Sequence, residues 1–221
     1  MNINGRISPG EVIFNRQNAL GMDELAKTVF APVYPVISRN AVEKTGIKGG
    51  LGLELGCGPA MFSIAMAKEN PDMEIIAMDF SDVSRYIAEV NIASEGLQER
   101  IFTITDNVQA LSMDDGCVDL VFSRGSMFFW DDLRAAFSEI YRILSPGGAT
   151  YIGGGFGNRA LEEEITGQMR KLNPEWSCHA RRFQESGDIK KLEGLLEEIT
   201  NGLFMIINDD SGIWAILSKP A

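Results

Sequence analysis

Short apolar runs alternate with amphipathic stretches from residue 51 almost to the end of the chain. An apolar run bounded by glycine or polar residues is typical of a buried strand, whereas apolar residues three and four positions apart indicate a helix. The pattern predicts strands at 51–55, 73–79, 101–105, 117–123 and 149–155. It predicts helices at 60–69, 81–96, 131–144, 159–172 and 188–199. This alternation indicates right-handed crossovers and a largely parallel sheet.

The last apolar runs depart from the alternation. "LFMIIN" at 203–208 and "IWAILS" at 213–218 are separated only by the turn sequence "DDSG". Such a tight connection can join only antiparallel strands, because a parallel connection needs a long crossover. The sheet is therefore predicted to end in an antiparallel hairpin.

Residues 1–47 precede this alternation and have an irregular start followed by helical spacing. Pro32 and Pro35 interrupt that spacing, since proline lacks the N–H that a helix interior needs. We therefore expect a helical cap or lid at 1–47 that belongs to the same domain as the core at 48–221. A chain of 221 residues is long enough for one well-packed core.

Composition and charge narrow the classes of partner. The formal net charge is −11, which argues against nucleic acid, because binding to its phosphates depends on basic residues. The compact basic segment "HARRF" at 179–183 is expected to be an ordinary solvated face. No apolar run reaches the roughly 18 residues of a membrane span, and the first residues lack the pattern of a signal peptide. Three scattered cysteines suggest neither disulfides nor a metal site, so we expect a reduced, cytoplasmic protein.

The stretch "ELGCGPAMF" at 54–62 follows the first predicted strand and opens a predicted helix. Glu54 is followed by small residues at every second position, namely Gly56, Gly58 and Ala60. In an open α/β sheet such a turn faces the ligand crevice at the carboxyl ends of the strands. A dinucleotide fingerprint would need its third small residue where Met61 stands, and no Gly-Lys-Ser/Thr follows as in a phosphate-binding P-loop.

"ELGCGPA" resembles the first motif of the class I S-adenosylmethionine-dependent methyltransferases, with alanine at position 60 where a glycine is more usual. The predicted hairpin is similar to the antiparallel closure of that family's sheet, and the resemblance runs from about residue 51 to the C-terminus. It implies a Rossmann-like, doubly wound α/β fold with a mostly parallel seven-stranded sheet and an N-terminal helical cap. It also implies S-adenosylmethionine as cofactor and S-adenosylhomocysteine as product.

The resemblance assigns roles to the ends of the later strands. Asp79 lies 21 residues after Gly58, where the family has an acidic residue that accepts from both ribose hydroxyls, and Phe80 beside it would lie against the adenine. "TDNV" at 105–108 resembles the adenine-binding segment, with Asp106 accepting from the adenine amino group. "VDLVFS" at 118–123 resembles the motif that ends near the methionine part. The implied cofactor contacts are Tyr34, Glu54, Gly56, Cys57, Gly58, Ala60, Asp79, Phe80, Ser81, Asp106, Asn107, Val108, Ser123, Arg124 and Ser126.

The segment "SRGSMFFWDD" at 123–132 is the expected specificity element. Arg124 either pairs with a carboxylate of the cofactor or substrate, or with a structural acid. Phe128, Phe129 and Trp130 are expected to be core residues that anchor helix 131–144, with an aromatic wall for the acceptor as the alternative. Further substrate contacts are expected at Phe156 and Asn158. Tyr34 is either a cofactor contact or a helix-packing residue.

Catalytic residues are not assigned, because methyl transfer from an activated sulfonium mainly requires alignment and exclusion of water. His179 is the only histidine, and it is expected to be a surface or packing residue rather than a general base. The sequence thus predicts methyl transfer to a small molecule by a monomer or homodimer, without metal or membrane. The alternatives are a nicotinamide-dependent oxidoreductase and a non-catalytic binding module with the same fold.

Overall fold

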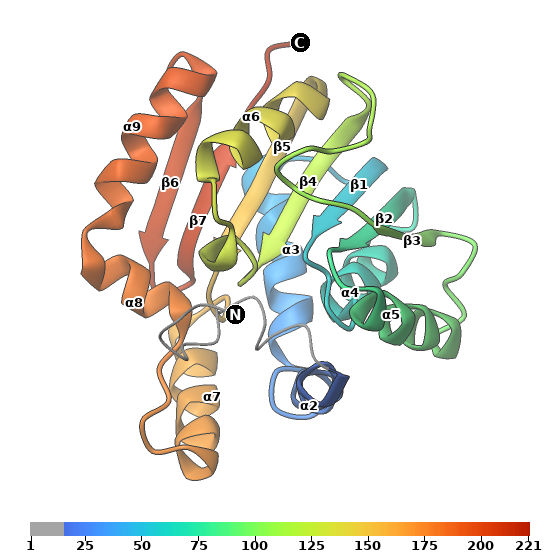
Figure 1. The fold of residues 1–221 in the computed structure, drawn as a ribbon, viewed down its shortest axis with the longest axis vertical. Coiled ribbons are helices and arrows are strands. Elements are labelled where there is room, and N and C mark those ends of the chain that lie inside the picture. Colours follow the sequence, from blue (N-terminus) through green and yellow to red (C-terminus); the bar gives the residue numbers. More distant parts are fainter. Residues whose placement is uncertain (1–15) are drawn as a thin grey trace, which may run out of the picture.

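The computed structural model describes residues 16–221, and its central feature is a seven-stranded sheet with the order β3-β2-β1-β4-β5-β7-β6 (Figure 1). The strands are β1 (Gly50–Leu55), β2 (Met73–Asp79), β3 (Ile101–Thr105), β4 (Val118–Arg124), β5 (Leu144–Gly154), β6 (Phe204–Asp209) and β7 (Gly212–Leu217). Strands β1 to β5 pair in parallel, whereas β7 is antiparallel to both β5 and β6. The predicted Rossmann-like sheet with its C-terminal hairpin is confirmed.

Helices cover both faces of the sheet and divide the core in two. They are α2 (Arg16–Lys27), α3 (Val33–Thr45), α4 (Met61–Glu69), α5 (Asp82–Ser94), α6 (Leu133–Ile143), α7 (Arg159–Leu172), α8 (His179–Ser186) and α9 (Asp188–Thr200), with a 3₁₀ turn, η1 (Met127–Phe129). One core contains buried side chains of α3, α4 and α5, and the other contains those of α6 and α9 (Figure 1). Both cores bury alternating side chains of the same strands, as expected for a sheet covered on both faces.

The predicted break at Pro32 is present, because α2 ends at Lys27 and α3 begins at Val33, whereas Pro35 does not interrupt α3. Pro32 is the N-cap of α3, and Pro35 lies in its first turn, where the backbone N–H groups have no acceptor within the helix. Helix α3 therefore continues to Thr45, and its Ile37 is buried in the core that also contains side chains of α4 and α5. Residues 1–15 of the predicted cap and the expected absence of a signal peptide lie outside the described residues.

Two further elements, strand β5 and helix α8, differ from the prediction. Strand β5 begins at Leu144 rather than at residue 149, because Leu144 already pairs with Val118 of β4, ahead of a register shift in this pairing. Backbone hydrogen bonds between Lys219 and both Gly147 and Gly148 hold the stretch that follows. Helix α8 was not predicted. The basic segment at 179–183 opens it, with Arg181 and Arg182 exposed, as expected for a solvated face, and Ala180 buried. Within residues 16–221 no helix is long and apolar enough to cross a membrane.

Candidate functional site

The turn after β1 is built from residues with positive φ. Gly56, Gly58 and Ala60 have φ of 67°, 52° and 60°, a region that glycine enters readily and alanine only at a cost. The Cys57 N–H donates to the Met78 carbonyl at 2.8 Å and so ties the turn to β2. Cys57 itself is buried, and burial raises the pKa of its thiol well above the usual range. The turn is therefore a fixed backbone cradle that leads directly into α4.

The two glycines of this turn are expected to respond differently to alanine. A Cβ at Gly56 would collide with the Ser126 hydroxyl, whereas a Cβ at Gly58 would meet no atom of residues 16–221 within 4 Å apart from its chain neighbours. We expect Gly56→Ala to destabilise the fold by about 3–5 kcal/mol and Gly58→Ala by only about 1–2 kcal/mol. Urea unfolding of the two variants measures the difference, and equal losses would contradict the described packing of Gly56 against Ser126.

Glu54 lies at the end of β1 and is buried. One carboxylate oxygen accepts from the Ser63 N–H at 2.9 Å and from the Ser63 hydroxyl, both in the first turn of α4. Burial raises the pKa of this carboxyl to about 8. The contacts of the side chain are thus with α4, and its implied contact with a cofactor stays a prediction.

Asp79 joins the turn after β1 to the turn after β2. Its Oδ2 accepts from the Gly58 N–H and its Oδ1 from the Ser81 N–H, each at 2.9 Å. Burial raises the pKa of this carboxyl, although these backbone donors oppose the shift. Ser81 also caps α5 by accepting from the Ser84 N–H, and Phe80 between them is 61% exposed. The structure therefore brings Gly58 and Asp79 together, as the sequence predicted.

Asp106 follows β3 at the carboxyl ends of the strands, where its N–H donates to the Asp79 carbonyl at 3.3 Å. Its carboxylate accepts from the Asn107 N–H at 2.8 Å and from the N–H and hydroxyl of Ser112. Val108 is buried in the core on the α6 side. Asp106 thus organises the loop after β3, and its implied contact with adenine stays a prediction.

Arg124 ends β4 inside an aromatic cage. The guanidinium lies 5.1 Å from the ring centre of Phe30, 5.7 Å from that of Tyr34 and 5.5 Å from that of Phe156. Its Nε donates to the Gly155 carbonyl at 2.9 Å. The ion pairs among residues 16–221 do not include Arg124, so the structural acid considered as its partner is not found in the described chain. A cation held among rings without a carboxylate can still accept an anionic ligand.

Tyr34 forms part of this cage from the first turn of α3. It is buried, and the burial raises the pKa of its hydroxyl to about 12. Tyr34 therefore packs α3 against the core and at the same time forms one wall of the cage around Arg124.

The aromatic residues in the segment after β4 lie beside two helices, α6 and α8. The Trp130 indole donates to the Ser126 hydroxyl at 2.9 Å and packs 5.9 Å from Phe137 of α6, in the expected anchoring role. Phe128 packs against the core that contains α6 and α9, as expected for a core residue, whereas Phe129 is partly exposed. Both rings also lie beside His179 of α8, at ring-centre distances of 6.4 Å for Phe128 and 4.6 Å for Phe129.

The remaining predicted residues have structural contacts. The buried Ser123 hydroxyl donates to the Leu55 carbonyl at 2.7 Å and holds β4 against the end of β1. Asn158 caps α7 by accepting from the Leu161 N–H. His179 is the first residue of α8, and burial together with Arg182 lowers its pKa.

Phe30 and Trp176 were missed by the sequence analysis. Phe30 lies between α2 and α3, and Trp176 lies 6.5 Å from Phe156 in the connection from α7 to α8. Neither residue belongs to a periodic pattern that would have identified it. In the described part of the chain no three His, Cys, Asp or Glu residues are grouped as metal ligands.

The comparisons with known proteins identify the family. The model of a methyltransferase domain matches residues 53–152. A crystal structure from Methanococcus maripaludis, assigned to the S-adenosyl-L-methionine-dependent methyltransferases, is 41% identical, with a TM-score of 0.89 over 100% of this chain and 98% of that one. The chain belongs to the S-adenosylmethionine-dependent methyltransferase family.

Curated relatives with named substrates are more distant. A demethylmenaquinone methyltransferase of Lactiplantibacillus plantarum is 32% identical over 43% of this chain and 40% of its own length. A malonyl-[acyl-carrier protein] O-methyltransferase of Ilyobacter polytropus is 27% identical over 72% of this chain and 54% of its own. The chain spans about half the length of these relatives, whose acceptors differ from each other.

Proposed function

We propose that this protein transfers the methyl group of S-adenosylmethionine to a small-molecule acceptor. The observation that carries the proposal is the link between Gly58 and the Asp79 carboxylate at the carboxyl edge of the sheet. This is where an open α/β sheet binds its ligand, and apart from the neighbouring residues of the turn no atom of residues 16–221 lies within 4 Å of the place where a Cβ of Gly58 would be. The space over the turn therefore suits a ligand that approaches the backbone closely.

The residues present fit this cofactor. Asp79 supplies acceptors for ribose hydroxyls, the segment from Asp106 to Val108 supplies groups for adenine, and Arg124 supplies a cation for the methionyl carboxylate. When bound, S-adenosylmethionine would supply a methyl group already activated on a sulfonium. The protein would then bind and orient the reactants and exclude water, which the aromatic rings around Arg124 favour.

A small acceptor is supported by the charge and by the aromatic residues. The net charge of −11 disfavours a nucleic-acid acceptor, and the partly exposed Phe129 and Trp176 offer ring surface for a small organic molecule. We further propose that α2 and α3 belong to a cap over the core at 48–221. The cysteines of the described chain are free, which supports a cytoplasmic location.

Isothermal titration of S-adenosylmethionine and S-adenosylhomocysteine into the protein tests the cofactor assignment. We expect one site per chain with micromolar affinity for both, and no heat from NADH or NADPH. Absence of binding by both sulfur compounds would overturn the proposal. Incubation with methyl-labelled S-adenosylmethionine and candidate acceptors then tests transfer.

Arg124 can be tested separately as the carboxylate partner. Arg124→Met keeps an apolar side chain in the cage but removes the charge, and we expect S-adenosylhomocysteine to bind about 10- to 100-fold more weakly. An analogue without the carboxylate should bind wild type and variant equally. The matched control is Arg134→Met on the exposed face of α6, which should change neither affinity. Unchanged binding by Arg124→Met would assign the guanidinium to the acceptor rather than to the cofactor.

A further inference from the structure

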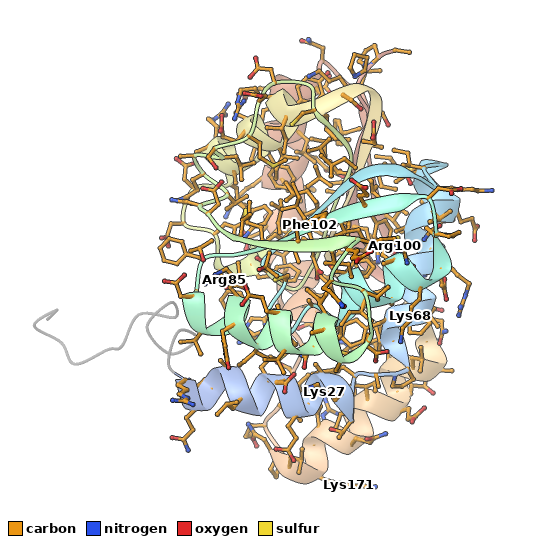
Figure 2. The ribbon with its side chains drawn as sticks, turned by 90° about the vertical axis from the view of Figure 1, so that its right-hand side faces the viewer. Lys27, Lys68, Arg85, Arg100, Phe102 and Lys171 are labelled. Carbon is orange, nitrogen blue, oxygen red and sulfur yellow. The ribbon has the colours of Figure 1, made fainter. Side chains whose placement is uncertain are left out.

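Strand β3 forms one end of the sheet, and no strand of the described chain pairs with its outer edge (Figure 2). Its sequence, "IFTIT", is entirely β-branched or aromatic. Exposed edge strands are usually protected by charge, proline, a bulge or a covering element, because their free backbone groups attract other strands. The opposite edge strand, β6, has such protection, since it contains the charged residue Asp209, whereas β3 contains no charged residue.

The hydrogen bonds to β2 define which backbone groups of β3 face outwards. The Arg100 carbonyl accepts from the Ile75 N–H, and the Asp106 N–H donates to the Asp79 carbonyl, so the even-numbered residues bond inwards. Alternate residues of a strand direct these groups to opposite sides. Both backbone groups of Thr103 and the N–H of Thr105 therefore point to the open edge.

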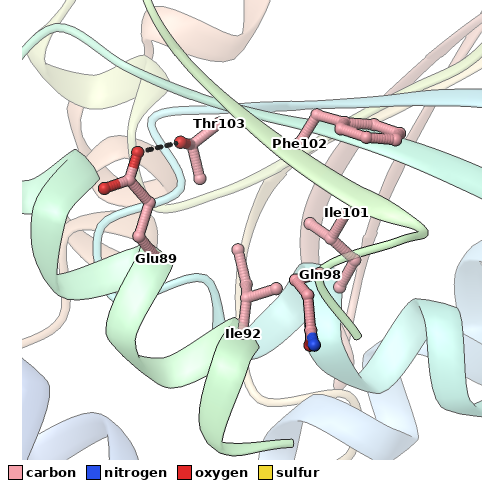
Figure 3. A pocket seen from close by; sticks show the side chains of 6 residues that line it. All are labelled: Glu89, Ile92, Gln98, Ile101, Phe102 and Thr103. Carbon is pink, nitrogen blue, oxygen red and sulfur yellow. Dashed lines mark hydrogen bonds between the residues drawn. The ribbon is translucent and has the colours of Figure 1, made fainter. Parts of the chain in front are cut away.

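The surface around this edge is apolar and hollowed. Phe102 is 48% exposed, and Tyr86 and Val90 of the adjacent α5 are more exposed still. A hollow of about 280 Å³ lies between α5 and β3, and Figure 3 shows its lining. The lining residues are Glu89, Ile92, Gln98, Ile101, Phe102 and Thr103. In Figure 3 Phe102 projects from the side of β3 opposite to Thr103, so both faces of the edge offer contacts.

We propose that this edge binds a second copy of the same chain, with two β3 strands paired antiparallel about a two-fold axis at Thr103. This is the register in which all five residues of the strand find partners. Thr103 exchanges both backbone hydrogen bonds with the partner's Thr103, and the Thr105 N–H reaches the partner's Ile101 carbonyl. On one face, Phe102 packs against the partner's Ile104, which covers the exposed ring.

The charges and apolar residues of α5 match the same two-fold axis. Thr105 bonds Asp82 near the start of α5, and Thr103 bonds Glu89 further along, so the helix runs antiparallel to the strand. The axis then sets the first half of one α5 beside the second half of the other. Arg85 faces the partner's Glu89, and Tyr86 faces the partner's Val90. This self-complementary order favours a second copy over an unrelated extended peptide.

Analytical ultracentrifugation across the micromolar range tests the dimer. We expect the wild type to reach twice the chain mass of 24.3 kDa, and Phe102→Lys to remain at 24.3 kDa throughout. Met205→Lys is the matched control, because Met205 has the same 48% exposure on the opposite edge strand. It should dimerise as the wild type does. A wild type that is monomeric at every concentration, or equal behaviour of the two variants, would overturn the proposal.

Cysteine cross-linking tests the register without depending on the Phe102 variant. Residues opposite each other in a hydrogen-bonded antiparallel pair have Cα atoms about 5.5 Å apart, which a disulfide can span. In a chain with Cys117 and Cys178 changed to serine, Thr103→Cys should form a reducible dimer on oxidation with copper phenanthroline. Thr105→Cys should not, since its partner is Ile101. Equal cross-linking at both positions, or none at Thr103→Cys, contradicts the proposed pairing.

Discussion

Asp79→Ala is expected to weaken binding of S-adenosylhomocysteine by about 100-fold or more, measured by titration calorimetry. A carboxylate that accepts from two ribose hydroxyls makes two charge-assisted hydrogen bonds, each worth about 1.5–3 kcal/mol. Asp79 is buried at the carboxyl ends of the strands, where the ligand is proposed to bind. In the variant, water therefore does not readily supply the hydrogen bonds that the carboxylate made. The control is Asp82→Asn, an exposed carboxylate three residues further along the chain, which should bind the ligand as the wild type does.

A loss of binding could also come from the turns that Asp79 supports. Its carboxylate accepts from Gly58 and Ser81, so Asp79→Ala leaves two N–H groups without their partner and should lower the melting temperature as well. An analogue of S-adenosylhomocysteine without the ribose hydroxyls separates the two effects. The wild type should prefer the hydroxylated ligand strongly, and the variant should bind both alike. A variant that keeps the wild-type preference would show that the hydroxyls are bound elsewhere.

The fold was predictable where the sequence marks the ends of elements clearly. β2 and α7 begin and end at the predicted residues, because polar or glycine-containing segments flank a clear apolar period. β5 was predicted to start at residue 149, since Ser145-Pro146-Gly147-Gly148 is a typical helix stop. What extends the strand is pairing of Leu144 with Val118 of β4 and hydrogen bonding of Gly147 and Gly148 to Lys219, which no local pattern contains.

The site was predictable only where its residues lie at the ends of neighbouring strands. Gly58 and Asp79 follow neighbouring parallel strands, whose carboxyl ends must meet, and they are hydrogen bonded in the structure. The aromatic cage could not be predicted, because Phe30, Tyr34 and Phe156 come from separate segments that only the fold brings around Arg124. Arg124 was assigned from the family resemblance, but only the structure shows that no carboxylate of residues 16–221 forms an ion pair with it.

Glu54 is expected to make the ligand-free protein less stable as the pH rises towards 8. The pKa of this buried carboxyl is about 8 in the folded chain, against an ordinary value of 4.5. Between these values the folded state holds a proton that the unfolded state has released, so stability falls by up to about 1.4 kcal/mol per pH unit. Below pH 4.5 both states are protonated and the penalty is absent. Asp79, whose pKa is also raised, acts in the same direction.

Glu54→Gln should remove this slope, because the amide stays neutral and its oxygen can still accept from the Ser63 N–H. From pH 6 to pH 8 we expect the melting temperature of the wild type to fall by about 5 °C more than that of the variant. The exposed residue Glu74 supplies the control, since Glu74→Gln should follow the wild type at every pH. Ser63→Ala adds a second test. It removes a hydroxyl that favours the ionised carboxyl, so the fall should extend to higher pH. Parallel profiles for wild type and Glu54→Gln would mean that Glu54 is already ionised in the folded protein between pH 6 and pH 8, which would contradict the raised pKa.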